Sequence, residues 1–211
     1  MSFEALAGSR RSIRKYAPDP IPAQDVEAML RAAQSAPSAC GAQNWLFVAL
    51  KRREDIEGLA AAVEAGLRRA HREFLPEAEE SYLAGRVRQS TFFRSAPLVF
   101  AVYMRPVAYV DARLEQAMRD GGLTYVQEMD RLGRPDLLGV GAAVENLLLC
   151  AADLGYGGCW MNAPVLAAPE INAYLGKAEE PDLRLLSLVP VGKPAYTPRE
   201  KPLRPDAVEY R

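Results

Sequence analysis

The sequence predicts one domain of the α+β class. Two short apolar runs, at residues 45–50 and 96–103, are typical of buried strands, whereas residues 141–154 would be apolar on nearly every side of a helix. Strand-like and helix-like segments follow one another in no regular alternation, and there is no internal repeat or low-complexity tract. A chain of 211 residues can bury a core of its own, so we expect a single domain over residues 1–211.

The elements of the first half can be placed by their periodicity. Residues 22–34 are expected to form a helix with Pro22 in its first turn, because one face is apolar, formed by Val26, Met29, Leu30 and Ala33. The run at 45–50 is the first strand, and residues 55–74 again have a helical pattern. The run at 96–103 is a second strand, with Pro97 at its start, where a missing N–H donor is tolerated.

The second half contains one helix and two further strands. No assignment is made for residues 106–136. The apolar helix at 141–154 belongs in a core or at a subunit interface, and Gly155 is suited to end it. Residues 159–161 and 185–191 are expected to be strands. After Gly192, dense proline favours an extended arm over a helix, with residues Pro194, Pro198, Pro202 and Pro205.

Composition excludes several classes of protein. Lys and Arg number 26 against 27 Asp and Glu, and this balance argues against non-specific binding to nucleic acid. No uninterrupted apolar run is long enough to cross a bilayer, and no secretory signal is present, so no membrane partner is expected. Three widely spaced cysteines, Cys40, Cys150 and Cys159, indicate free thiols in a reducing compartment, hence a cytoplasmic protein. The lone histidine, His71, is expected at the surface and cannot build a zinc site.

A cluster of cations opens the chain. Arg10, Arg11, Arg14 and Lys15 surround Ser12 within six residues of an otherwise nearly neutral protein. Arginine presents a rigid fork of donors that fits a phosphate group, and a serine hydroxyl adds a neutral donor. Taken alone, such a segment is more often a solvated basic turn than a binding site. As a binding site, it would hold the phosphate of a cofactor or substrate.

A glycine pattern later in the chain resembles a nucleotide-binding motif but lacks its context. Residues 139–144 read G-V-G-A-A-V, where the dinucleotide pattern needs glycine or alanine at the last position and a preceding strand. Residues 135–138 are too short and broken for that strand. The sequence has no H-E-x-x-H, C-x-x-C or G-x-S-x-G motif, so zinc hydrolysis and serine-esterase chemistry have no support.

Four segments in order resemble the nitroreductase family of flavin mononucleotide (FMN) enzymes. Residues 10–14, R-R-S-I-R, match its opening R-x-S-x-R, and residues 36–45, A-P-S-A-C-G-A-Q-N-W, match A-P-S-x-x-N-x-Q-P-W. Residues 151–161 match A-x-x-L-G-x-G-x-x-W, and the tail from Val191 resembles a closing G-x-P with a basic, proline-rich stretch. The chain departs from the family at Gly41, where Asn is common, and at Asn44, where Pro is common.

The resemblance implies a cofactor site for FMN. Arg10, Ser12 and Arg14 would hold its phosphate and ribityl chain, with Arg11 contributing. Met161, Asn162 and Ala163 would lie along the flavin edge, where the backbone N–H of Asn162 points at the reactive ring nitrogen. Lys201, with Arg199 or Arg204, would reach the phosphate from the C-terminal arm.

The resemblance also implies an assembly. Members form an intertwined homodimer around a central, mainly antiparallel sheet flanked by helices, with exchange of C-terminal arms and FMN at the subunit interface. Pro37 and Ser38 would therefore serve the partner's cofactor, and Gln43 belongs to the same loop. The apolar helix at 141–154 would form the core of the dimer.

The implied chemistry is ping-pong hydride transfer from NADH or NADPH, through FMN, to an electron-poor small-molecule acceptor such as a nitroaromatic or a quinone. The flavin carries the reaction, so no catalytic side chain and no metal are expected. Specificity would lie in a variable lid region at about residues 56–138. Two alternatives stay open: an FMN carrier or sensor without turnover, and a specialised member such as a reductive dehalogenase. A module that binds a phosphorylated partner without flavin is the interpretation outside this family.

Overall fold

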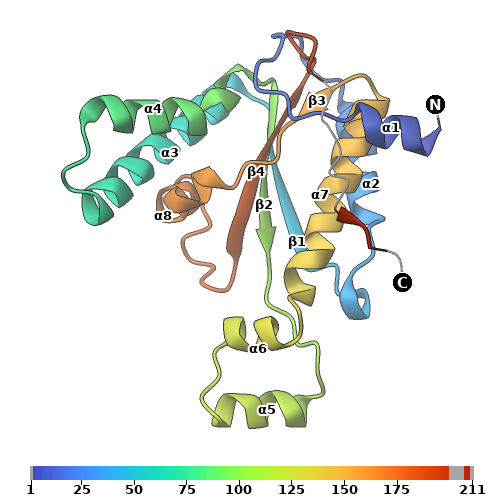
Figure 1. Cartoon of the computed structure of the whole chain (residues 1–211), viewed down its shortest axis with the longest axis vertical. Helices are drawn as coiled ribbons and strands as arrows, with labels where there is room; N and C mark the ends of the chain where they lie inside the picture. Colours follow the sequence, from blue (N-terminus) through green and yellow to red (C-terminus); the bar gives the residue numbers. More distant parts are fainter. Residues whose placement is uncertain (1, 200–206, 210–211) are drawn as a thin grey trace.

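The structure is a computed structural model that describes residues 2–199 and 207–209. A four-stranded antiparallel sheet lies at its centre (Figure 1). The spatial order is β1-β2-β4-β3, with β1 and β3 at the edges. The strands are β1 (Trp45–Leu50), β2 (Leu98–Met104), β3 (Gly157–Gly158) and β4 (Arg184–Gly192). Helices around this small antiparallel sheet confirm the predicted α+β class.

Strand β2 divides the interior into two cores. All its seven residues are buried, and successive side chains point to opposite faces of the sheet. Leu98, Phe100, Val102 and Met104 belong to one cluster of buried side chains. Val99, Ala101 and Tyr103 belong to the other. The central strand is therefore apolar on both faces, which is why it is a continuous hydrophobic run in the sequence.

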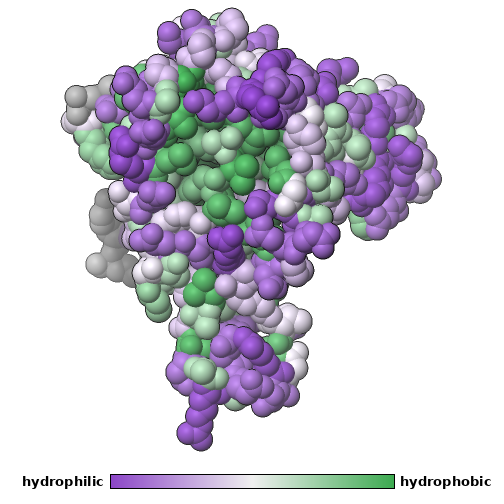
Figure 2. All heavy atoms as spheres, turned by 180° about the vertical axis from the view of Figure 1, so that it is seen from behind, coloured by the Kyte–Doolittle hydropathy of each residue, from purple (hydrophilic) through white to green (hydrophobic). Residues whose placement is uncertain are grey.

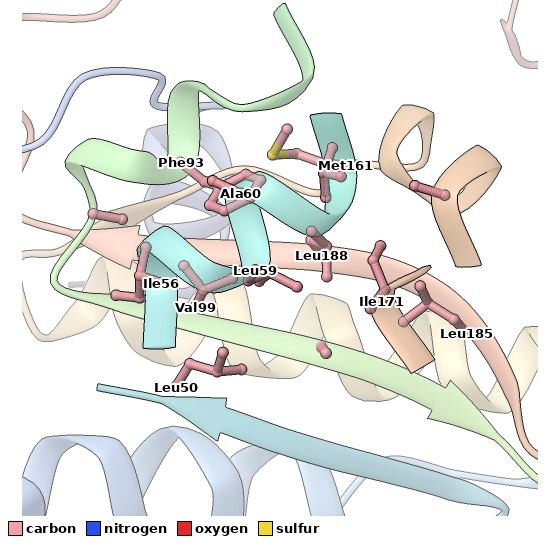
Figure 3. Close-up of a cluster of buried hydrophobic side chains, with 14 of the residues drawn as sticks. Leu50, Ile56, Leu59, Ala60, Phe93, Val99, Met161, Ile171, Leu185 and Leu188 are labelled. Carbon is pink, nitrogen blue, oxygen red and sulfur yellow. The ribbon is translucent and has the colours of Figure 1, made fainter. Parts of the chain in front are cut away.

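The face of the sheet that carries Val99, Ala101 and Tyr103 is covered by three helices and two short turns. These are α3 (Arg53–Phe74), α4 (Glu80–Ser90), α8 (Ala168–Tyr174), η2 (Phe92–Ser95) and η3 (Ala163–Ala167). Figure 3 shows this core, where Ile56 and Leu59 of α3 lie over Val99 and Leu188 of the sheet.

The second face is covered by α2 (Ala23–Gln34) and α7 (Pro135–Asp153), with α1 (Phe3–Ser9) lying beside α7 (Figure 1). By length and composition alone α7 could cross a membrane, a test that the core helix of a soluble protein also passes. Here Val140, Val144 and Leu147 of α7 are buried against the sheet and α2.

Helices α5 (Ala112–Asp120) and α6 (Tyr125–Arg131) project from the end of the sheet as a hairpin (Figure 1). The side chain of Asp111 caps α5 by accepting from two backbone N–H groups, and Thr124 with Gln127 forms a capping box at α6. This hairpin lies inside residues 56–138, where a variable lid is predicted. The remainder of that range supplies α3 and β2 to the core.

Several expectations need correction. Helix α7 begins at Pro135, not at residue 141, so the two glycines of the G-V-G pattern lie inside a helix. The strand expected at 159–161 is displaced to β3, and Met161 makes only an isolated bridge to Leu188. Glycine is required in β3 because a Cβ at Gly157 would lie 2.2 Å from Ile13 and one at Gly158 would lie 2.6 Å from Leu148.

Other differences concern omitted helices and one side chain. No helix is predicted from the sequence at α1, α4, α5, α6, η1 (Ala39–Gly41) or α8, while β1 and α2 are confirmed nearly to the residue. His71 is half-buried instead of lying fully at the surface, with Nδ1 2.7 Å from the carbonyl of Leu67. The three cysteines are free thiols, as expected.

Candidate functional site

The predicted phosphate ligands meet around one thiol. Arg10, Ser12 and Arg14 all interact with Cys159, Ser12 through a hydrogen-bonding contact and the two arginines through their charge. Burial raises the pKa of the Cys159 thiol, and these three neighbours oppose that rise. Residues separated by almost 150 positions thus form one basic site.

The sheet edge explains this meeting. Ser12 forms a parallel bridge with Gly158, and the backbone N–H of Ile13 donates to the carbonyl of Gly158 at 2.9 Å. Side chains alternate along an extended segment, so the buried Ile13 turns Ser12 and Arg14 outward on the same side. The basic segment is therefore held by the backbone of β3, and its side chains are left for binding.

Arg10 has an incompletely used guanidinium. Its Nε lies 2.9 Å from Oε1 of Glu145 on α7, at ion-pair distance, yet no acceptor within residues 2–199 and 207–209 is aligned for a hydrogen bond with this buried atom. Arg14 has no ion pair in the same ranges. Two cations without full compensation are suited to an anionic ligand.

Arg11 is engaged differently from its neighbours. Its Nε donates to the carbonyl of Arg199 at 3.1 Å, and its Nη1 donates to the carbonyls of Gly8 and Arg10. Arg11 thereby ties the start of the C-terminal arm to the end of α1. The N–H of Ala195 donates to the carbonyl of Lys15, which holds the arm along the same segment. Lys201 and Arg204, both expected at the phosphate, lie outside the described residues.

The segment after Cys159 runs along β4 toward the predicted flavin edge. Met161 and Leu188 exchange backbone hydrogen bonds at 2.9 and 3.0 Å. The side-chain Nδ2 of Asn162 donates to the carbonyl of Leu186 at 2.9 Å. Asn162 and Ala163 are exposed, and the backbone N–H of Asn162 finds no acceptor in the described part of the chain. Its main chain is therefore free to meet a ligand, while the predicted contact with the flavin ring stays a prediction.

A cavity of about 170 Å³ adjoins Asn162. Its walls come from α7, the 160–162 segment and β4, with residues Leu137, Val140, Gly141, Trp160, Asn162, Leu186 and Ser187. Gly141 faces the indole, since a Cβ there would lie 3.4 Å from Cη2 of Trp160, an ordinary contact distance. The basic cluster and this cavity lie at the two ends of one extended segment.

The loop after α2 lies elsewhere. Pro37 and Ser38 line a second cavity, of about 400 Å³, with Leu138, Gly139 and Ala142 of α7. Residues 139 and 141 point about 200° apart around a helix axis. Ser38 and Trp160 therefore contact opposite sides of α7, and within one chain Pro37 and Ser38 do not join the Arg10–Asn162 site.

The backbone of this loop is strongly turned. Cys40, Gly41 and Gln43 have positive φ angles of 54°, 64° and 42°. The hydroxyl of Ser38 accepts from the backbone N–H of Gln43 at 3.0 Å, closing the turn. Gln43 itself is exposed, and it too is absent from the Arg10–Asn162 site.

Asn44, one of the two departures from the family pattern, has a structural role. It is buried, and its Nδ2 donates to the carbonyls of Asp136 at 3.1 Å and of Arg105 at 3.3 Å. A proline has no side-chain donor for these carbonyls. The residue thus connects the start of β1 to the start of α7.

Two polar residues of the site were missed from the sequence. Glu145 is a charge inside the apolar helix α7, and Ser187 is a hydroxyl inside the apolar strand β4. Each interrupts a hydrophobic run. Ser187 is buried, and a buried polar group is expected to have a partner or a ligand, whereas the side chain of Glu145 is 43% exposed and pairs with Arg10. In the described ranges, no group of three or more His, Cys, Asp or Glu side chains is placed to hold a metal ion.

Comparison with known proteins agrees with this geometry. The model of the Nitroreductase family matches residues 7–193. The chain belongs to the nitroreductase family. A nitroreductase-fold structure, the BluB-like flavoprotein from Clostridium difficile 630, superposes with a TM-score of 0.80 at 28% identity, covering 97% of this chain and 95% of that one.

Two further nitroreductase-family comparisons extend the match. The nitroreductase with bound FMN from Bacteroides fragilis superposes with a TM-score of 0.73 at 22% identity, over 99% of this chain and 97% of that one, and shows the shared fold. A protein from Archaeoglobus fulgidus named NADH dehydrogenase/NAD(P)H nitroreductase is 29% identical over 153 residues, or 72% of this chain. The aligned stretch spans 63% of that relative's length.

Proposed function

We propose that this nitroreductase-family chain is an FMN-dependent oxidoreductase that uses NADH or NADPH to reduce electron-poor acceptors such as nitroaromatics or quinones. The main support for this function is the single extended segment from Gly158 to Asn162. Arg10, Ser12 and Arg14 gather at its first end, and an unengaged backbone N–H with an adjoining cavity lies at its other end. This spacing of an anion site from a ring-sized recess suits a phosphorylated cofactor.

The residues present fit FMN. The buried Nε of Arg10 lacks an aligned acceptor in the described residues, and the phosphate supplies one. Ser12 and Arg14 share the phosphate and ribityl oxygens, while Glu145 holds Arg10 from the side of α7. When bound, FMN accepts a hydride from the nicotinamide and passes it to the acceptor. Met161, Asn162 and Ala163 orient the ring by their main chain, and either Lys201, Arg199 or Arg204 adds a cation from the arm.

The functional unit is a homodimer with FMN between the subunits. Pro37 and Ser38 lie across α7 from the site of their own chain, and Gln43 is tied to Ser38 in the same loop, so these residues serve the cofactor of the partner. On α7, Leu138 is 68% exposed, and the edge strand β1 is only half-buried from Trp45 to Val48. Figure 2 shows a hollowed apolar area, between hydrophilic borders, on the face opposite to Figure 1. A second subunit with its C-terminal arm covers such surface.

The acceptor is selected by the α5–α6 hairpin, which projects beside the loop of Cys40. Tyr109, on the strand-to-hairpin connection, lies close enough to interact with Cys40, Tyr125 and Asp136. A cytoplasmic location, without a membrane or nucleic-acid partner, accords with the balanced charge.

The test is an absorption spectrum of the purified protein after incubation with FMN and removal of excess. Bound flavin absorbance that disappears on anaerobic addition of NADH or NADPH is expected, and the effective donor identifies the co-substrate. Bound flavin that no nicotinamide donor bleaches indicates a carrier or sensor. Protein that retains no FMN contradicts the proposal. Sedimentation of the FMN-loaded protein tests the assembly, and a flavin-loaded monomer contradicts the shared site.

A further inference from the structure

We propose that Ser187 is a cofactor-binding residue whose hydroxyl donates a hydrogen bond to the FMN ring system. This inference rests on the proposed function and names a contact that the family motifs do not include. It starts from the cavity beside Asn162, where Ser187 is one of two polar side chains among seven lining residues.

The hydroxyl of Ser187 is buried without a protein partner. The residue is 1% exposed, and its Oγ forms no hydrogen bond within the described residues. Its neighbours on β4 are leucines, at positions 185, 186 and 188. Leaving such a group unsatisfied costs free energy, whereas alanine would fill the same position without that cost. A retained, unsatisfied hydroxyl that lines a cavity therefore points to a ligand.

The cavity suits the edge of a planar heteroaromatic ring. Its walls are apolar at Leu137, Val140 and Leu186, and the edge of the Trp160 indole faces Gly141 in the same recess. The other polar side chain, Asn162, directs one of the two N–H groups of its Nδ2 to the carbonyl of Leu186. Ser187 is distinguished from it as a fully buried hydroxyl of this recess that has no partner among the described residues. Ring carbonyls and ring nitrogens of a flavin are acceptors that it can meet, whereas the phosphate is held at the other end of the segment.

The test compares three full-length variants as apo-proteins. Ser187→Ala removes the hydroxyl, and Ser187→Thr retains one. Ser90→Ala is the matched control, because Ser90 is also 1% exposed but lies on α4, on the opposite face of the sheet from α7. The measurements are the Kd of FMN, the position of the visible absorption bands of bound FMN, and the thermal midpoint of each apo-protein.

The expected result for Ser187→Ala is FMN binding weaker by roughly tenfold, the scale of one lost hydrogen bond, with shifted absorption bands. Its apo-protein should melt no lower than wild type, which separates a ligand contact from a structural one. Ser187→Thr should restore the Kd and the bands, and Ser90→Ala should bind FMN as wild type does.

Two outcomes overturn the inference in different ways. If wild type and Ser187→Ala bind FMN with equal Kd and identical bands, Ser187 does not touch the ring, while the proposed function stands. The inference also fails if Ser187→Ala alters only sedimentation or apo stability, since the hydroxyl then meets a partner subunit or a water. If wild type itself binds no FMN, the proposed function fails and this inference fails with it.

Discussion

Gly139 and Ser38 approach so closely that a Cβ at residue 139 would lie 3.2 Å from the Cβ of Ser38. Two residues later, Gly141 faces the other side of α7, where a Cβ would meet the indole of Trp160 at the ordinary contact distance of 3.4 Å. Of the two glycines in the G-V-G pattern, Gly139 is therefore the tight packing position, and it packs against the loop proposed to serve the partner. The resemblance of this pattern to a dinucleotide motif has a steric explanation at Gly139.

The first prediction concerns this packing. Gly139→Val should displace the loop of Ser38, lowering the thermal midpoint and loosening FMN retention, because the nearest neighbours include backbone atoms that cannot rotate away. Gly85→Ala is the control, since the added Cβ on α4 meets nothing within 4 Å. That control should gain about 0.5–1 kcal/mol from helix propensity. A Gly139→Val protein with unchanged melting and FMN retention would show that the loop is free to move.

The second prediction concerns the phosphate cluster. Arg14→Ala should weaken FMN binding by roughly 10- to 100-fold, since a hydrogen bond with a charged group contributes about 1.5–3 kcal/mol. The control is Arg113→Ala on the projecting helix α5, where the side chain is exposed. Equilibrium dialysis with FMN measures both. Equal Kd values for the two variants would remove Arg14 from the site.

Much of the fold could be predicted from local pattern. Strand β1 is found at the expected residues because a short apolar run is bounded on both sides by polar or turn residues, and α2 is found because its apolar face repeats at helical spacing. The predicted start of helix α7 is six residues late, since Gly139 opposes a helix on propensity alone. The close contact with Ser38 explains this glycine, and such a distant contact cannot be seen in a local window.

The site was less predictable from the residues themselves. The basic segment at Arg10 is evident in the sequence, yet only β3 shows that Cys159 lies within it. Arg11 looked equivalent to Arg10, but its donors go to backbone carbonyls. The sequence does not indicate a role for Ser187 or Glu145, because the role of a single polar residue in an apolar run can be inferred only when its neighbours in space are known. That these residues bind FMN stays a prediction.

The third prediction concerns the base of the projecting hairpin. Asp136 is fully buried and accepts from Nε and Nη2 of Arg134 at 2.9 and 2.8 Å. Asp136→Ala should cost about 2–4 kcal/mol of unfolding free energy, because it removes one partner of a buried ion pair and an acidic group in the first turn of α7. Urea unfolding measures the change.

Asp130→Ala is its matched control. Asp130 contacts the same Arg134 at 3.3 Å, but its side chain is 59% exposed. An exposed ion pair contributes about 0–1 kcal/mol, so this variant should remain near wild type. Equal losses for the two variants would mean that burial does not determine the strength of the pair.

The fourth prediction is a pH dependence. The hydroxyl of Tyr156, after α7, donates to Oδ2 of Asp25 on α2 at 2.6 Å. This hydrogen bond, and secondarily burial, raises the pKa of Tyr156 to about 12. Because the pKa is higher in the folded state than the value of about 10 in the unfolded chain, the stabilisation is fully present below pH 10 and is lost as pH rises toward 12.

Tyr156→Phe isolates this contribution, since wild type and variant share every other titrating group. Near pH 8 the variant should be less stable by about 1 kcal/mol, a typical value for one hydrogen bond that is partly open to solvent. At about pH 11 the difference should shrink, because Tyr156 is ionised in the unfolded chain but still protonated in the folded protein, so that rising pH favours the unfolded state. Urea unfolding at both pH values measures it. A difference that stays constant between them would mean that the Tyr156 proton does not link α2 to the end of α7.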